Sequence, residues 1–176
     1  GTDCAPFLAN LFLYSYEREW MDMMVEEKRI DILNRFRFCS RYIDDLLCIN
    51  NDQMMDSYMT KIYPSELSLT SDNATSQSNY LDLKLEIRNG KIHHNLFDKR
   101  DAFDFAILNF PDLSGNIPAS QSYGVFTSQL IRYARCCQDF DDFRKRTLAL
   151  VGRLVQQHFS IGQLRRTFEK FVACHY

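Results

Sequence analysis

Phe38-Cys39-Ser40-Arg41-Tyr42-Ile43-Asp44-Asp45-Leu46-Leu47 is the stretch that carries the strongest structural signal in this chain of 176 residues. Two adjacent aspartates separate residues 36–42, whose side chains alternate in character, from an apolar run at residues 46–49. Alternation with a period of two is typical of a β-strand, and a short apolar run is compatible with a second one. The pattern predicts a β-hairpin within residues 35–50, with the two aspartates at its tip.

The paired carboxylates indicate a metal site. Two like charges about 4 Å apart repel each other by roughly 4 kcal/mol at an effective dielectric constant of 20. A divalent cation removes this repulsion, and hard cations such as Mg²⁺ or Mn²⁺ take oxygen ligands and leave room for substrate phosphates. Asp44 and Asp45 are therefore candidate ligands of a phosphoryl-transfer site. From these two residues alone, a simple polar turn between strands is the alternative.

The rest of the N-terminal half predicts helices and a strand. Residues 6–29 begin with a proline and continue with apolar side chains spaced by three or four, which indicates one long, largely buried helix. An Asn or Asp at residues 51–52 caps a short helix that ends at Ile62, because Pro64 prevents it from continuing much further. Residues 66–70 are expected to form a short strand.

The C-terminal half predicts a second hairpin and three helices. Asn89-Gly90 stands between apolar runs and supplies the positive φ angles of a type I′ turn. Residues 99–117 contain several breakers and are taken as a linker between domains at residues 1–98 and 118–176. Three amphipathic helices are expected, at residues 120–137, 141–158 and 161–174. The fold class is α+β.

The composition indicates a globular, soluble intracellular protein, and residence in the nucleus or cytoplasm is expected only from the role inferred below. Hydrophobic residues make up 45% of the chain, enough for one core or two small ones. No stretch approaches the roughly 18 apolar residues of a membrane span, and no signal peptide is evident. The six cysteines include no C-x-x-C pair, which favours reduced thiols over zinc or disulfides. Because apolar residues follow Gly1 almost at once, we interpret the chain as a fragment.

The charge is unevenly distributed. Residues 1–98 hold 10 Lys and Arg against 16 Asp and Glu, whereas residues 99–176 hold 11 against 7. The C-terminal part is therefore net positive, which is compatible with a surface that faces phosphates. Solvated helix faces are the alternative explanation.

Two motifs resemble those of reverse transcriptases. Residues 38–47 resemble the aromatic-x-Asp-Asp hairpin of this family, in which apolar strands flank the aspartates. The start of the chain, Gly1-Thr2-Asp3-Cys4-Ala5-Pro6-Phe7-Leu8-Ala9-Asn10-Leu11-Phe12, resembles the preceding motif, where a Gly-containing turn and a Pro open the long palm helix. The two motifs stand in the family's order, about thirty residues apart.

Within the family, the chain is most similar to Penelope-like retroelements. The similarity lies in the aromatic and acidic residues 14–17 and in Tyr80-Leu81-Asp82-Leu83, which leads towards Asp98-Lys99-Arg100. The string Asp98-Lys99-Arg100-Asp101 departs from the Arg-Lys-Pro-Thr pattern of that group. The resemblance implies part of a polymerase palm at residues 1–98 and a helical thumb at residues 118–176.

The same resemblance implies roles for single residues. Asp44 is the principal ligand of Mg²⁺ or Mn²⁺ and Asp45 its partner, while Tyr42 packs beside the primer end, supports the hairpin, or is simply a core residue. The turn on the template and nucleotide side is matched by Gly1, Cys4 and Pro6.

Further basic residues are implied to contact nucleic acid. Lys99 and Arg100 follow the hairpin that matches the primer grip, and they either meet backbone phosphates or lie in a solvated loop. The thumb arginines and lysine expected near a duplex are Arg132, Arg135, Arg144, Lys145, Arg146, Arg153, Arg165 and Arg166. The implied partners are an RNA template, a DNA primer, deoxynucleoside triphosphates, and the fingers and palm segment upstream of Gly1.

One catalytic carboxylate of the family precedes the motif at Gly1, so we expect the 176 residues alone not to polymerise DNA. Two other interpretations stay open. The chain is a decayed or domesticated relic that binds nucleic acid without catalysis, or it is an unrelated module whose helical half binds a protein. Phosphate binding weakens steeply with salt, whereas an apolar helix interface does not.

Overall fold

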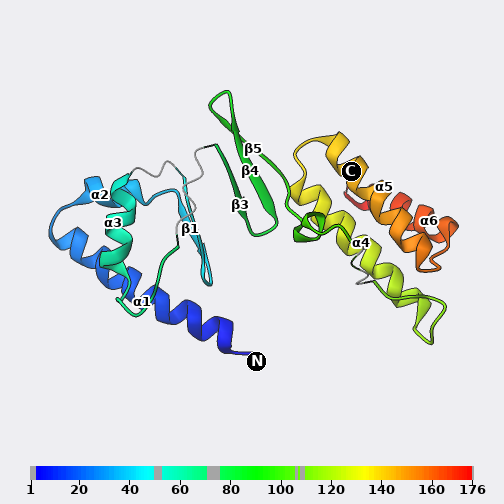
Figure 1. Cartoon of the computed structure of the whole chain (residues 1–176), viewed down its shortest axis with the longest axis horizontal. Coiled ribbons are helices and arrows are strands. Elements are labelled where there is room, and N and C mark those ends of the chain that lie inside the picture. Colours follow the sequence, from blue (N-terminus) through cyan, green and yellow to red (C-terminus); the bar gives the residue numbers. More distant parts are fainter. Residues whose placement is uncertain (1–2, 50–52, 71–75, 106, 108–109, 176) are drawn as a thin grey trace. The chain divides into compact units, whose positions relative to one another are not determined.

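The computed structural model describes residues 3–49, 53–70, 76–105, 107 and 110–175 (Figure 1). These residues form a mixed α+β structure with two small antiparallel sheets, as the predicted fold class requires. The contacts divide the chain into two compact units, Gly1–Ala74 and Thr75–Tyr176.

The first unit contains three helices and one hairpin among its described residues. In chain order these are α1 (Ala5–Glu26), α2 (Ile30–Arg35), β1 (Cys39–Tyr42), β2 (Asp45–Cys48) and α3 (Gln53–Ile62). The long helix, the hairpin and the helix before Pro64 are confirmed, although the predicted caps at residues 51–52 lie outside the described residues. The strand predicted at residues 66–70 is wrong. Instead, the Leu67 N–H donates to the Pro64 carbonyl at 3.0 Å in a turn, and residues 66–70 pair with no strand of the described residues.

The core of the first unit is small and aromatic. It consists of Trp20, Met24, Ile32, Met59, Ile62 and Tyr63. The Trp20 and Phe36 rings pack edge to face with centroids 4.9 Å apart. The expectation that α1 is largely buried is wrong, because only Trp20 and Met24 of this helix are buried, while Phe7 is 69% exposed. The other elements of the unit cover only one side of α1.

The second unit is a three-stranded meander followed by three helices. Its elements are β3 (Gln77–Tyr80), β4 (Leu83–Arg88), β5 (Lys91–Leu96), the 3₁₀ turn η1 (Lys99–Ala102), α4 (Ala119–Cys136), α5 (Phe140–Gln156) and α6 (Ile161–His175). Asn89 and Gly90 have φ angles of 51° and 73°, which confirms the type I′ turn. The three predicted helices are also confirmed.

The boundary predicted after residue 98 differs from the observed division. The sheet β3-β4-β5 belongs with the helices, because Leu96 is buried among residues of α4, α5 and α6. In addition, the His94 N–H donates to Gln138 Oε1 at 3.1 Å, and the Gln138 N–H donates to the His94 carbonyl at 3.2 Å. The contacts that fix this sheet are therefore made with the helices that follow the predicted linker at residues 99–117.

The largest cost of a single truncation is expected in the core of the second unit. Leu154 on α5 is fully buried, so Leu154→Ala should lower the free energy of unfolding by about 3 kcal/mol through lost burial and a residual cavity. Leu148 on the same helix is 60% exposed, and Leu148→Ala should change it by less than about 0.5 kcal/mol. Urea unfolding followed by circular dichroism measures both. Equal effects would contradict the packing described for α5.

Candidate active site

The β1–β2 hairpin presents both aspartates to solvent. Tyr42 pairs with Asp45 across the hairpin, so Ile43 and Asp44 form a two-residue turn. Asp44 lies in this turn and Asp45 is the first residue of β2, and both side chains are exposed. The predicted position of the carboxylates at the tip is confirmed.

The turn contains an unusual backbone conformation. Ile43 has a φ of 54°, in the left-handed region that β-branched residues rarely adopt because their side chain crowds the backbone. Such a conformation persists only where the surrounding structure holds it. Here Arg41 Nη1 donates to the Ile43 carbonyl at 3.1 Å. The side chain two residues earlier thus holds the strained peptide in place.

Arg41 also fastens the hairpin to α1. Its Nε and Nη2 donate to the two carboxylate oxygens of Glu17, at 2.5 and 3.1 Å, in a bidentate pair. Its Nη1 donates to Asn10 Oδ1 at 2.7 Å. The Arg41 and Glu17 side chains are only 13% and 23% exposed, so this pair is largely removed from water. Bidentate arginine–carboxylate pairs fix geometry as well as charge.

A tyrosine from beyond α3 completes this network. The Tyr63 hydroxyl donates to Glu17 Oε1 at 2.6 Å. Burial and the hydrogen bond to Glu17 raise the pKa of Tyr63, so it stays a neutral donor. Its hydrogen bond with Glu17 likewise raises the pKa of Arg41. The network therefore contains one positive charge, on Arg41, and one negative charge, on Glu17. These two charges neutralise each other, so the network provides no cation to pair with the aspartates of the turn.

The side chains of Asp44 and Asp45 have neither an ion-pair nor a hydrogen-bond partner within the part of the chain that the structure describes. Exposed carboxylates without a protein cation are suitable ligands for a hard divalent cation. Among the described residues, no group of three or more His, Cys, Asp or Glu side chains is placed to hold a metal ion. The two carboxylates alone would therefore supply only part of the oxygen coordination shell of a cation such as Mg²⁺ or Mn²⁺.

The other predicted residues of the first unit have different environments. Tyr42 is 55% exposed, so the predicted core role is wrong. Because Tyr42 is directly opposite Asp45, the two side chains are on the same side of the hairpin. Gly1 lies outside the described residues. Cys4 and Pro6 are exposed at the start of α1, and Pro6 is one helical turn before Asn10, which contacts Arg41.

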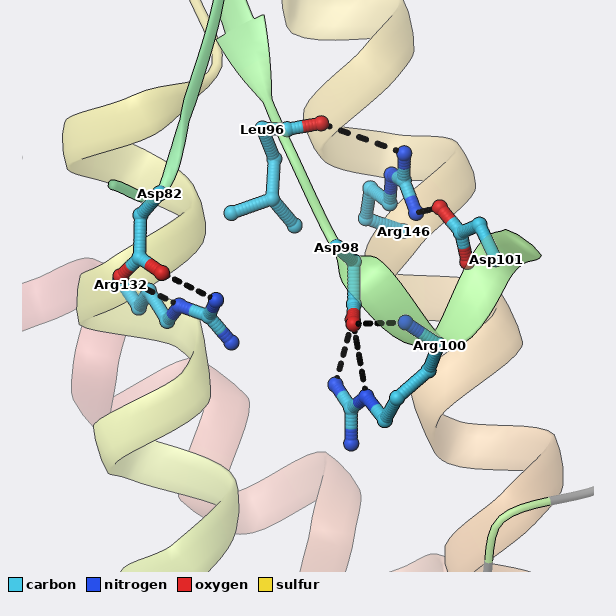
Figure 2. Close-up of polar contacts among 7 residues, drawn as sticks. All are labelled: Asp82, Leu96, Asp98, Arg100, Asp101, Arg132 and Arg146. Atoms are coloured by element: carbon cyan, nitrogen blue, oxygen red, sulfur yellow. Dashed lines mark hydrogen bonds and ion pairs between the residues drawn. The ribbon is translucent and has the colours of Figure 1, made fainter. Parts of the chain in front are cut away.

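In the second unit, Arg100 is held by its neighbour, while Lys99 is exposed. Figure 2 shows the guanidinium of Arg100 against the carboxylate of Asp98, with Nη2 and Oδ2 at 2.5 Å. Asp98 is 8% exposed, and its hydrogen bonds with Arg100 lower its pKa to about 2. The carboxylate also accepts from the Arg100 backbone N–H at 3.1 Å, which caps η1. This arrangement gives Arg100 a structural role, and its predicted phosphate contact stays a prediction.

Two predicted thumb arginines likewise bind within the unit (Figure 2). Arg132 on α4 pairs with Asp82 at 2.6 Å, and Arg146 on α5 pairs with Asp101 and donates to the Leu96 carbonyl at 3.3 Å. Arg165 pairs with Glu169 on its own helix. Among the predicted thumb residues, those that are exposed and have no ion-pair partner within the described part of the chain are Arg135, Arg144, Lys145 and Arg166. Arg153 is half-buried.

The sequence analysis missed the residues that position the candidate site, namely Arg41, Glu17, Asn10 and Tyr63. Asn10 and Glu17 are seven residues apart on α1 and therefore lie on one face of the helix. The only sequence signal for this network was the position of Arg41, a charged residue within a short hairpin strand and opposite the apolar Leu46. It did not identify the partner, which is 24 residues away in the sequence.

No protein-family model, no curated protein and no solved structure matches the chain. No helix in the described ranges is long and apolar enough to cross a membrane.

Removal of the Arg41 guanidinium should destabilise the first unit. In Arg41→Met, the largely buried carboxylate of Glu17 loses its charged hydrogen-bond donors and has little access to water in their place. This loss should lower the free energy of unfolding by about 2 kcal/mol. The exposed pair of Arg18 and Asp22 on α1 provides the matched control, and Arg18→Met should have little effect. Trp20, the single tryptophan, reports this unit by fluorescence during urea unfolding. An Arg41 variant as stable as the Arg18 variant would refute the anchoring role.

The pair of Asp98 and Arg100 should make the second unit sensitive to acid. The pKa of Asp98 is about 2 in the folded chain, against about 3.9 in an unfolded one. Its stabilising contribution is therefore complete above about pH 4 and disappears as the pH falls towards 2. Asp98→Asn should be less stable than the wild type near neutral pH, and the gap should close near pH 2. Thermal unfolding at several pH values tests this, and a gap that stays constant would contradict it.

Proposed function

We propose that this chain is part of an RNA-directed DNA polymerase of a Penelope-like retroelement, with the palm hairpin in the first unit and the thumb helices in the second. The observation that carries the proposal is the pair of exposed, unpartnered carboxylates on a hairpin that Arg41 fixes to α1. The motif order around this hairpin, from Gly1 through Asp45, supports the same proposal.

The proposed reaction is attack of a primer 3′-hydroxyl on a deoxynucleoside triphosphate. Divalent cations, when bound, supply the charge that stabilises the attacking and leaving oxygens. Asp44 and Asp45 would hold Mg²⁺ or Mn²⁺ through their oxygens, together with ligands from substrate, water and a further carboxylate upstream. Tyr42 is exposed and paired with Asp45, so its side chain is on the same side of the hairpin as the Asp45 carboxylate. In this scheme, Tyr42 would pack beside the primer end.

The fixed hairpin matters for such a reaction because the protein mainly positions reactants and neutralises charge. A turn held by Arg41 presents its carboxylates in one orientation, so little ordering remains when the substrates bind. Asn10, Glu17 and Tyr63 act through Arg41 and are positioning residues in this scheme.

The second unit supplies the cations for a nucleic-acid partner. Five exposed cationic side chains on α4, α5 and α6 have no ion-pair partner within the described residues: Arg135, Arg144, Lys145, Arg166 and Lys170. Together with Lys99, they are suited to contact the backbone phosphates of an RNA template and a DNA primer without reading their sequence.

A second candidate function is protein binding by the helices. An apolar groove of about 260 Å³ lies among α4, α5 and α6, with exposed Phe140, Leu148 and Ile161 at its rim. Thr147 Oγ1 is buried in its wall without a hydrogen-bond partner. Exposed apolar surface of this kind is typical of interaction sites. Binding of RNA–DNA duplex should weaken steeply between low and moderate salt, whereas binding of a protein to this groove should not.

Primer extension tests the proposed function. We expect the chain joined to the coding sequence upstream of Gly1 to extend a primer on an RNA template, and Asp44→Ala to reduce the rate at least about 100-fold. Asp56→Ala, which removes another exposed aspartate of the same unit, should leave the rate unchanged. The 176 residues alone should not extend the primer. Inactivity of the folded joined chain, with or without Asp44, would favour the relic.

A further inference from the structure

Two cysteines face each other near the base of the β1–β2 hairpin. Cys39, the first residue of β1, pairs with Cys48, the last residue of β2. Their sulfur atoms are 3.1 Å apart, and both thiols are free. The two side chains share the inner face of the hairpin with Arg41 and Leu46, and they pack against the aromatic core of the unit. Neither residue is used by the proposed metal site.

The backbone around this pair allows the sulfurs to approach further. The Cys39 N–H donates to the Phe36 carbonyl at 3.0 Å, not to Cys48, whereas the Ile49 N–H donates to the Phe38 carbonyl at 3.1 Å. Cys39 and Cys48 therefore form a non-hydrogen-bonded pair, the type in which cross-strand side chains lie closest together. A disulfide bond has a sulfur–sulfur distance of about 2.05 Å, so the thiols are about 1 Å from bonding distance.

We propose that Cys39 and Cys48 are a redox-modifiable dithiol, which hydrogen peroxide converts into a disulfide across the hairpin and a dithiol reductant converts back. The Cys48 thiolate attacks one peroxide oxygen, the O–O bond breaks, and hydroxide leaves, which gives a sulfenic acid. The Cys39 sulfur then attacks the sulfenic sulfur, and water leaves as the S–S bond forms. Two thiols are oxidised and one peroxide is reduced to two waters. A dithiol reductant reverses the reaction by thiol exchange.

The environments of the six cysteines favour this pair. The hydrogen bond from the Cys39 thiol lowers the pKa of Cys48, which favours the reactive thiolate at that position. Burial raises the pKa of Cys136, and it raises that of Cys137 to about 12, so these adjacent thiols are poor nucleophiles. Cys4 and Cys174 are exposed, and neither forms a hydrogen bond with another cysteine within the described residues.

The disulfide would join the strands at the end of the hairpin away from Asp44 and Asp45. It closes a short loop that contains the whole turn, and a cross-link of this kind stabilises chiefly by restricting the unfolded chain. The oxidised hairpin should therefore open less readily than the reduced one. This inference does not rest on the proposed polymerase function, because the sulfur geometry is independent of what the carboxylates bind.

Peptide mapping of the whole chain tests the inference. Cys4→Ser and Cys174→Ser remove the exposed thiols that would link separate molecules. This variant is treated with hydrogen peroxide, free thiols are alkylated, and trypsin is added without reductant. Trypsin cuts after Arg37, Arg41 and Lys61, so a disulfide would join peptide 38–41 to peptide 42–61. We expect this linked pair, two hydrogens lighter than the summed thiol peptides, and we expect dithiothreitol to remove it.

Two further measurements make the result decisive. When the chain is unfolded in urea before peroxide is added, the linked pair should form in a lower yield than in the folded chain, although the short loop between the two cysteines still favours it over more distant pairings. In a Cys39→Ser version whose Trp20 fluorescence matches the parent, Cys48 should stop at the sulfenic acid and be labelled by dimedone. Alkylation of both Cys39 and Cys48 in the folded, peroxide-treated chain would overturn the inference. Linkage of Cys48 to Cys136 or Cys137 instead would overturn it as well.

Discussion

The pair between Arg41 and Glu17 is the interaction on which the first unit depends. One guanidinium reaches the carboxylate of Glu17, the side chain of Asn10 and the carbonyl of Ile43, and so joins α1 to the turn of the hairpin. Tyr63 brings the end of α3 to the same carboxylate. Removing one partner of such a largely buried ion pair destabilises a protein by much more than the intact pair stabilises it, because the remaining charge is left without solvent or partner. The carboxylates of the turn owe their orientation to this network.

The second unit provides an internal comparison for the candidate site. Tyr42-Ile43-Asp44 and Tyr80-Leu81-Asp82 form the same kind of turn, with φ angles of 54° and 52° at the aliphatic residue. Asp82 is neutralised by Arg132, whereas Asp44 has no such partner among the described residues. The position after the turn holds half-buried Leu83 in one hairpin and exposed Asp45 in the other. Turn formation therefore accounts for a single aspartate but not for two in sequence. Under the proposed function, the second carboxylate is a further metal ligand.

Local patterns made the helices and hairpins predictable, because their period and turn residues depend on neighbours in the sequence. The type I′ turn at Asn89-Gly90 is such a case. Contacts between distant residues were not predictable in the same way. A turn that begins at Pro64 stands where a strand was expected at residues 66–70. The ion pair of Asp82 and Arg132, which are 50 residues apart, joins the sheet to the helices of the second unit. The aspartates of the site were found from their type and order, but their anchor, Arg41, was not.

The exposed side of α1 connects the fold of the first unit to its proposed role. Phe7, Leu8, Leu11 and Phe12 are each more than half exposed near the end of the helix that contacts Arg41 through Asn10. A helix that is apolar on several faces is normally buried, since each such side chain gains roughly 1.5–3 kcal/mol when it leaves water. If nothing covered these side chains, the free energy of burying them would be lost next to the hydrogen-bond network of Arg41. Under the proposed function, the remaining palm and fingers would cover these residues, and the cover would complete the metal site from the same side.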